Sequence, residues 1–306
     1  MAVRFPLPPS SLLPSKIVHS AMGFFLTLVL TTAPSLAGDP FRPTQSRHIG
    51  DKTEAAFNQV FRYGNYQAAA TILQDAIASE TDEPLAFAMQ ASFAYTNKDM
   101  AGLATYAEKT LSAAQRLVSR DALRGNLYMA VGHFLEGAVI LSREGTVSGA
   151  PQALSKLRRV YEYLDKAEAI SPQDPELNLI KGYMDLMVAV NLPFANPEQA
   201  IARLEKNAAP RYLVDRGIAI AYRDLKNYDK ALTYVERALK DTKENPELHY
   251  LKAQILRAKA RDDKNKQMME TAIAFFDQAL AKRDQLPPGL VRQIERERRN
   301  SASSLI

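Results

Sequence analysis

The stretch of residues 211–246 constrains the fold of this chain most. It runs RYLVDRGIAIAYRDLKNYDKALTYVERALKDTKENP. Apolar residues recur three or four positions apart in two successive segments, as in two amphipathic helices. They are Leu213, Ile218, Ile220 and Tyr222 in the first segment and Ala231, Leu232, Val235, Ala238 and Leu239 in the second. Between them, Lys226-Asn227-Tyr228-Asp229 predicts a tight turn, so the stretch predicts a helical hairpin.

This hairpin resembles a helix–turn–helix unit of the tetratricopeptide (TPR) repeat family. Small residues occupy the two positions where that family's helices cross, with Ala219 at position 8 and Ala231 at position 20. Tyr222, Val235 and Ala238 fill positions 11, 24 and 27. The resemblance implies that helix pairs stack into a solenoid, because one pair cannot bury both of its faces.

The same pattern recurs along most of the chain. The position-20 residues are Ala69, Leu103, Val160, Ala200, Ala231 and Ala272. Their spacing is irregular compared with the family's repeat of about 34 residues. The resemblance covers residues 51–284 and implies an all-α fold, a right-handed α-α superhelix of about six irregular helix pairs. Phe57 departs from the pattern, because a small residue belongs at its position 8.

Two segments fall outside this pattern. The insertion at 136–158 is expected to continue a helix to about Ser142 and then to form a loop, because it contains several glycines and Pro151. Such a loop either carries contacts or acts as a spacer. Residues 285–306 are predicted to form a polar helix and tail that cap the solenoid. Contact of this helix with an anionic membrane is the alternative.

Residues 1–37 resemble a secretory signal peptide. Arg4 and Lys16 precede an apolar run at 21–30, and Ser35-Leu36-Ala37 provides small residues for cleavage. The apolar run is shorter than the roughly 20 residues that cross a bilayer comfortably. An uncleaved signal anchor is the alternative. In that case the N-terminal segment is the only part of the chain that is expected to contact the membrane.

Cleavage after Ala37 would leave Gly38 as the first residue of the mature chain. Residues 38–50 are rich in proline, glycine and polar side chains, which predicts a flexible linker. The solenoid is expected to begin at Asp51.

Composition excludes several classes of chemistry. The chain has no cysteine, which excludes disulfides, thiolate metal sites and cysteine nucleophiles. Its charge of +5 falls to +3 after residue 37, where 37 basic residues face 34 acidic ones, so no nucleic-acid partner is expected. The sequence lacks HExxH, EF-hand, Walker and GxGxxG motifs. His133 and Glu136 alone provide too few ligands for a metal site. We therefore expect that the protein is not an enzyme and that it binds no cofactor and no metal.

In TPR stacks, the first helix of each pair lines the concave face. The resemblance places these candidate partner-binding residues there: Tyr95, His133, Tyr183, Met187, Arg216, Arg223, Tyr250, Gln254 and Arg257. The predicted groove is apolar and aromatic in its middle and basic toward its C-terminal end. Arginines suit carboxylates, so a protein or an acidic peptide segment is the expected partner. In the alternative, these arginines pair with neighbouring acids such as Asp215 and Asp224.

Two hypotheses of function follow from the leader and the repeats together. The first is an exported scaffold that binds a protein or peptide in its groove. The sequence is similar to exported TPR-repeat proteins of cyanobacteria, which implies the periplasm or thylakoid lumen and a role in assembly or maintenance of an envelope or thylakoid membrane complex. The second is a membrane-tethered structural spacer that self-associates. Cleavage of the leader discriminates between the two.

Overall fold

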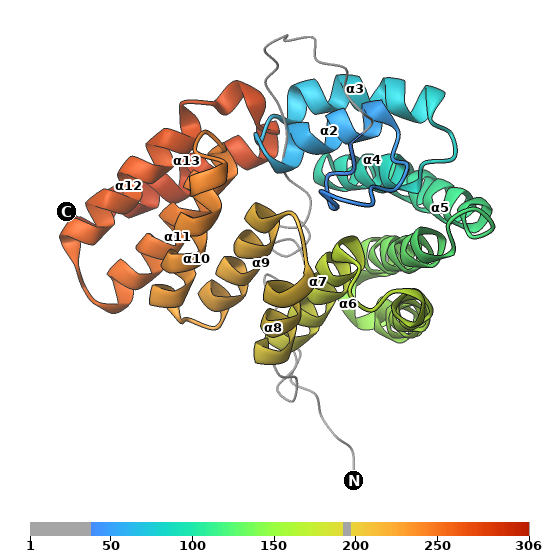
Figure 1. Cartoon of the computed structure of the whole chain (residues 1–306). Helices are drawn as coiled ribbons and strands as arrows, with labels where there is room; N and C mark the ends of the chain where they lie inside the picture. Colours follow the sequence, from blue (N-terminus) through green and yellow to red (C-terminus); the bar gives the residue numbers. More distant parts are fainter. Residues whose placement is uncertain (1–37, 192–196, 306) are drawn as a thin grey trace.

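The computed structural model describes residues 38–191 and 197–305. The predicted signal peptide at residues 1–37 lies outside the described residues. In the described part the fold is all-α, with 12 α-helices and no strand (Figure 1). Among these residues, no helix is both long enough and apolar enough to cross a bilayer.

Neighbouring helices along the chain pack as pairs, and the last helix follows alone (Figure 1). The helices are α2 (Asp51–Phe61), α3 (Tyr66–Ser79), α4 (Pro84–Thr96), α5 (Met100–Leu117), α6 (Ala122–Ile170), α7 (Pro175–Asn191), α8 (Pro197–Asn207), α9 (Arg211–Asp224), α10 (Tyr228–Asp241), α11 (Pro246–Asp262), α12 (Lys266–Leu280) and α13 (Pro288–Ser303), with a 3-10 turn η1 (Arg283–Gln285) before α13. The predicted all-α solenoid of helix pairs is thereby confirmed.

The helices of each pair cross at the small and apolar residues that mark the repeats. Ala69, Leu103, Val160, Ala200, Ala231 and Ala272 are all buried, with at most 3% of their surface exposed. Gly182 shows why position 8 is small. A Cβ atom there would lie 2.5 Å from Leu204 Cγ on the paired helix, far inside van der Waals contact.

The turns within four of the helix pairs have the same backbone conformation and the same kind of helix cap. Lys226 adopts a left-handed conformation with φ 61°, and the side chain of Asn227 then accepts a hydrogen bond from the Lys230 N–H. This N-cap supplies an acceptor for an otherwise unpaired helix donor. The same left-handed residue followed by an N-cap recurs at Gly64-Asn65, Lys98-Asp99 and Lys264-Asn265. The predicted turn is confirmed, although it ends at Asn227 because Tyr228 already begins α10.

The insertion at 136–158 is helical, and the expected loop after Ser142 is wrong. α6 continues from Ala122 to Ile170 and departs from helical geometry inside only at Gly145, with φ 78° and ψ 168°. This single glycine divides α6 into two halves that pack as a pair. None of residues 141–148 is buried, and Val147 is 73% exposed.

Residues 38–50 do not form the flexible linker that their composition predicted. Phe41 and Ile49 are buried at 3% and 0% exposure. The ring of Phe41 lies edge-on to Phe57, with 4.8 Å between centroids. The large side chain of Phe57 therefore packs against this added segment, which accounts for its departure from the repeat pattern.

A buried ionic network fastens the same segment to helices far along the chain. The Arg42 guanidinium donates to Asp39 at 2.6 Å, to Asp174 at 2.7 Å and to Glu176 at 3.0 Å. Arg124 of α6 also donates to Glu176, at 3.1 Å. Burial alone would raise the pKa of Glu176, but Arg124 and Arg42 hold it below its ordinary value. The network joins residues 39–42 to α6 and α7.

The two ends of the solenoid meet. The Tyr66 hydroxyl at the start of α3 donates to Glu247 Oε1 of α11 at 3.0 Å. Arg216 of α9 donates to the other oxygen of this carboxylate at 3.1 Å. A Cβ atom on Gly64 would lie 2.7 Å from Asn245 Oδ1, so the two turns touch. The helices therefore form a closed ring, in which α13 lies beside the first pair (Figure 1).

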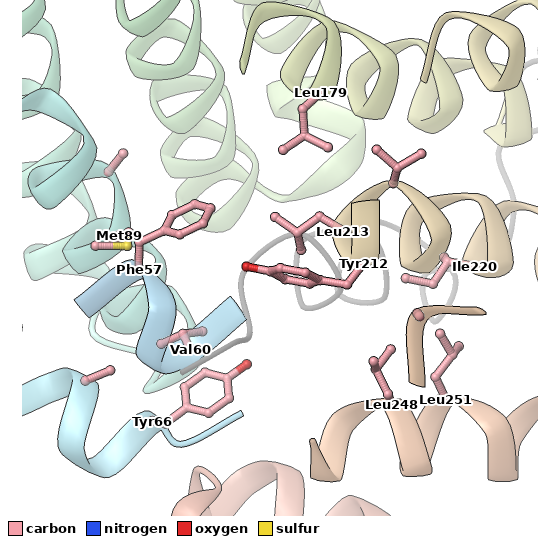
Figure 2. Close-up of a cluster of buried hydrophobic side chains, with 14 of the residues drawn as sticks. Phe57, Val60, Tyr66, Met89, Leu179, Tyr212, Leu213, Ile220, Leu248 and Leu251 are labelled. Carbon is pink, nitrogen blue, oxygen red and sulfur yellow. The ribbon is translucent and has the colours of Figure 1, made fainter. Parts of the chain in front are cut away.

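The hydrophobic core is continuous across this closure. Figure 2 shows Tyr212 and Leu213 of α9 between side chains of the first pair, such as Phe57 and Val60, and side chains of α11, such as Leu248. All of them belong to one buried cluster. Part of the inner face that an open solenoid would expose is therefore core.

Candidate binding surface on the inner helices

The predicted groove residues lie on the first helix of each pair. They are Tyr95 on α4, His133 on α6, Tyr183 and Met187 on α7, Arg216 and Arg223 on α9, and Tyr250, Gln254 and Arg257 on α11. The structure brings two sets of them together, Tyr183 with Met187 and Arg223 with Tyr250, Gln254 and Arg257. Each group has a different chemical character.

A small apolar hollow, with a cavity volume of about 20 Å³, lies between α7 and α9. Its lining residues are Tyr183, Leu186, Met187 and Val190 of α7 and Gly217, Ile220, Ala221 and Asp224 of α9. Tyr183 and Met187 are thereby brought together as predicted, and Leu186 and Ile220 extend the same apolar surface. The hollow is therefore shallow and far smaller than the roughly 300–1,000 Å³ of small-molecule pockets.

Tyr183 forms a fixed wall of this hollow. Its hydroxyl donates to the Leu213 carbonyl at 2.7 Å, and burial raises its pKa. Gly217 allows the ring to lie against α9, because a Cβ atom there would come within 2.7 Å of Tyr183 Cζ. The position of the ring is therefore set before any partner arrives.

The predicted basic end of the groove holds a carboxylate of the chain itself. Glu297 of α13 accepts from the Tyr250 hydroxyl at 2.9 Å, from Arg257 at 3.3 Å and from the Gln254 amide at 3.3 Å. Arg223 donates to the Gln254 side-chain oxygen at 2.8 Å. Burial, and next to it the charge of Glu297, raises the pKa of Tyr250. These residues form an acid-binding cluster, and α13 occupies it.

Arg216 lies inside the ring closure rather than on an accessible groove. It is 4% exposed and donates to Glu247, which also accepts from Tyr66. Burial raises the pKa of Glu247, and Arg216 opposes that rise. The prediction of Arg216 as an accessible partner-binding residue is wrong, because Arg216 is buried beneath the first pair.

The alternative that the groove arginines pair with acids of the chain is supported, because Arg216, Arg223 and Arg257 each pair with a carboxylate. Arg223 lies 2.9 Å from Asp224. Asp215 is held by Arg211 at 2.6 Å and by Arg237 at 3.1 Å, which both lie outside the predicted groove set.

His133 and Tyr95 lie apart from both clusters. His133 Nδ1 is 2.8 Å from Glu136 Oε2, which Lys156 also approaches at 2.6 Å. Burial would raise the pKa of Glu136, but its bonds to Lys156 and His133 lower it. Across residues 38–191 and 197–305, no group of three or more His, Asp or Glu side chains is arranged to hold a metal ion. Burial raises the pKa of Tyr95 on α4.

Sequence reasoning missed the contribution of α13 and of Glu247. Glu297 is separated from Tyr250 by 47 positions, and Glu247 from Tyr66 by 181. A helix pattern fixes which face a residue occupies but not which distant carboxylate reaches it. Comparison of the chain with protein-family models, with curated proteins and with solved structures gave no match.

Proposed function

We propose that this chain is an exported protein–protein interaction scaffold of the TPR type, similar to exported TPR-repeat proteins of cyanobacteria. The leader-like sequence at 1–37 and the recurring crossing residues support this proposal. The arrangement in helix pairs also supports it, because stacked pairs present extended surfaces to partners. The compartment is the periplasm or thylakoid lumen, and the role is assembly or maintenance of an envelope or thylakoid membrane complex.

The observation that carries this proposal is the hollow between α7 and α9. Its walls are apolar, apart from the Asp224 carboxylate and the Tyr183 hydroxyl. Met187 is unbranched and flexible, and such side chains adapt to different partners. A partner packs an apolar side chain against this surface, where desolvated aromatic and aliphatic contacts contribute most to binding.

The charge of the partner follows from the state of the arginines. Arg223 and Arg257 are engaged by Asp224 and Glu297, and Arg216 is buried against Glu247. An acidic segment would have to displace one of these carboxylates. The proposed primary contact is therefore apolar, and an acidic group on the partner is secondary.

The test uses the tagged full-length chain in its own host. Co-purifying proteins are quantified by mass spectrometry for the wild type, for Met187→Asp and for the control Ile170→Asp, whose side chain is 50% exposed away from the hollow. A stoichiometric partner should be lost from Met187→Asp and kept by the control, with both variants equally helical by circular dichroism. A partner retained by both variants would refute binding at this hollow.

A membrane-tethered spacer that self-associates is the second candidate. Exposed Val147 and Leu154 near the Gly145 bend favour it, because exposed apolar side chains are available for contact with another copy. Sedimentation of the wild type and of a Val147→Asp/Leu154→Asp variant tests it. An oligomer that the double variant abolishes supports the spacer, and a monomer in both cases rejects it.

A further inference from the structure

Gly38 is held against a carboxylate of the first helix. Its backbone N–H donates to Glu54 Oε2 of α2 at 2.9 Å. A Cβ atom at this position would lie 2.7 Å from Glu54 Oε1, so the lack of a side chain at Gly38 allows the carboxylate to lie this close to the backbone. The residues that follow are anchored, because buried Asp39 pairs with buried Arg42 at 2.6 Å. The position of the Gly38 nitrogen is therefore fixed from both sides.

Glu54 lacks a cation in the part of the chain that the structure describes. Its other hydrogen bond there comes from the Asn58 amide, at 3.4 Å. Burial raises the pKa of this carboxyl, and the charges of Asp51 and Asp39 add to the rise, while the bonds from Gly38 and Asn58 oppose it. Arg42 is committed to Asp39, Asp174 and Glu176. A half-buried acid among other acids is stabilised by a positive charge at hydrogen-bond distance.

We propose that cleavage of the Ala37–Gly38 bond supplies this charge: the new α-ammonium group of Gly38 forms an ion pair with Glu54. This inference rests on the proposed export of the chain. A peptidase of the signal-peptidase class adds water across the peptide bond, so that the carbon–nitrogen bond breaks and hydroxide joins the Ala37 carbonyl carbon. The Gly38 nitrogen takes up the remaining proton. At neutral pH the new carboxyl group loses a proton and the new amine binds one.

The ion pair gives leader removal a structural consequence. Before cleavage the Gly38 nitrogen is a neutral amide donor to Glu54, and after cleavage the same atom carries the charge that the site lacks. A cut one residue earlier or later would move the ammonium group away from the carboxylate. The pair would then fix the mature N-terminus to α2, next to the buried segment that includes Phe41. Processing would thus complete the first unit of the ring.

The test begins with the full-length chain expressed in a host that exports it. The N-terminus of the purified protein is identified by mass spectrometry, and the pKa of its α-amine is measured by pH-dependent reductive methylation. Glu54→Gln removes the proposed partner. Asp51→Asn is the matched control, because Asp51 acts on Glu54 only through its charge.

We expect a chain that starts at Gly38, with an α-amine pKa at least about one unit above the ordinary 7.7–8.0. That shift corresponds to about a tenfold lower fraction of reactive amine at a given pH. Glu54→Gln should return the pKa to the ordinary range, whereas Asp51→Asn should keep most of the shift. A chain that starts at another residue overturns the inference, as does an equal pKa in the wild type and Glu54→Gln. Because partner binding is not measured, a normal amine pKa on an exported chain refutes the ion pair and leaves the scaffold proposal standing.

Discussion

The substitution Arg42→Met tests most directly whether residues 38–50 are held to the rest of the fold by the buried ionic network. The guanidinium is 5% exposed and contacts Asp39, Asp174 and Glu176, whose side chains are at most 4% exposed. Methionine preserves much of the aliphatic volume while it removes the charge. The variant therefore leaves buried carboxylates without the cation that they share.

The contacts of this network give an estimate of how much unfolding free energy Arg42→Met loses. Removing one partner of a buried ion pair typically destabilises a protein by about 3–5 kcal/mol. Arg124 still donates to Glu176 at 3.1 Å, and Arg47 lies 3.8 Å from Asp174. Because these arginines compensate in part, we expect a loss near the lower end, about 3 kcal/mol of unfolding free energy at neutral pH.

The assay is urea unfolding followed by circular dichroism at pH 7. The control is Arg120→Met, which removes a pair with Asp82 whose side chains are 58% and 46% exposed. Exposed pairs contribute less than about 1 kcal/mol. Equal stability of Arg42→Met and Arg120→Met would refute the claim that residues 38–50 are fastened by a buried network.

Further predictions concern packing, backbone and pH. Ala231→Leu should overpack the α9–α10 crossing and cost about 1–3 kcal/mol in urea unfolding, and an unchanged midpoint would contradict the assigned crossing. Gly145→Ala should cost about 1–3 kcal/mol, because φ is 78° and ψ is 168° while no atom lies within 4 Å of the added methyl group; wild-type stability would show that the chain bends elsewhere. The lowered pKa values of Glu176 and Asp121 contribute stability that is present above the ordinary carboxyl pKa and is lost as pH falls through the lowered values. The raised pKa of Glu247 has the opposite effect, because its ionisation lowers stability at neutral pH and its protonation on acidification removes that cost. We expect the network to dominate, so that the melting temperature falls on acidification below about pH 4.5, and a constant melting temperature down to pH 3 would refute this.

Local patterns were sufficient to predict the helices. Crossing residues such as Ala231 and the cap at Asn227 act within one helix pair, so their spacing contains the information. The face of α7 that bears Tyr183 and Met187 was predicted for the same reason, since helical periodicity fixes which residues share a side. This is why the apolar hollow could be anticipated in part.

Composition misled the prediction at two segments. Residues 38–50 contain many loop-forming residues, yet Phe41 and Ile49 act as buried anchors and Arg42 reaches Asp174 132 positions away. The insertion at 136–158 contains several glycines, but only Gly145 has a positive φ among them. Glycine frequency alone did not show which one bends the chain.

The state of the basic end could not be predicted because carboxylates of neighbouring helices pair with its arginines and ring closure covers Arg216. Arg216 meets Glu247 beneath the first pair, and Arg257 meets Glu297 of α13. Both contacts join neighbouring elements of the solenoid, but Tyr66 reaches the Glu247 carboxylate only because the total rotation of the stacked pairs brings the two ends together. That rotation accumulates from many small packing angles, and no local pattern specifies it.

Ring closure is the central claim, and crosslinking tests it directly. The chain has no cysteine, so Gln67→Cys/Arg283→Cys introduces the two thiols of the experiment, on opposite sides of the junction between α3 and η1. A short bis-maleimide should join them within one chain under native conditions and fail in urea. The control pair Gln67→Cys/Leu154→Cys should remain unlinked in both. Efficient native crosslinking of the first pair alone is the predicted result, and a native first pair that does not crosslink would contradict the closed ring.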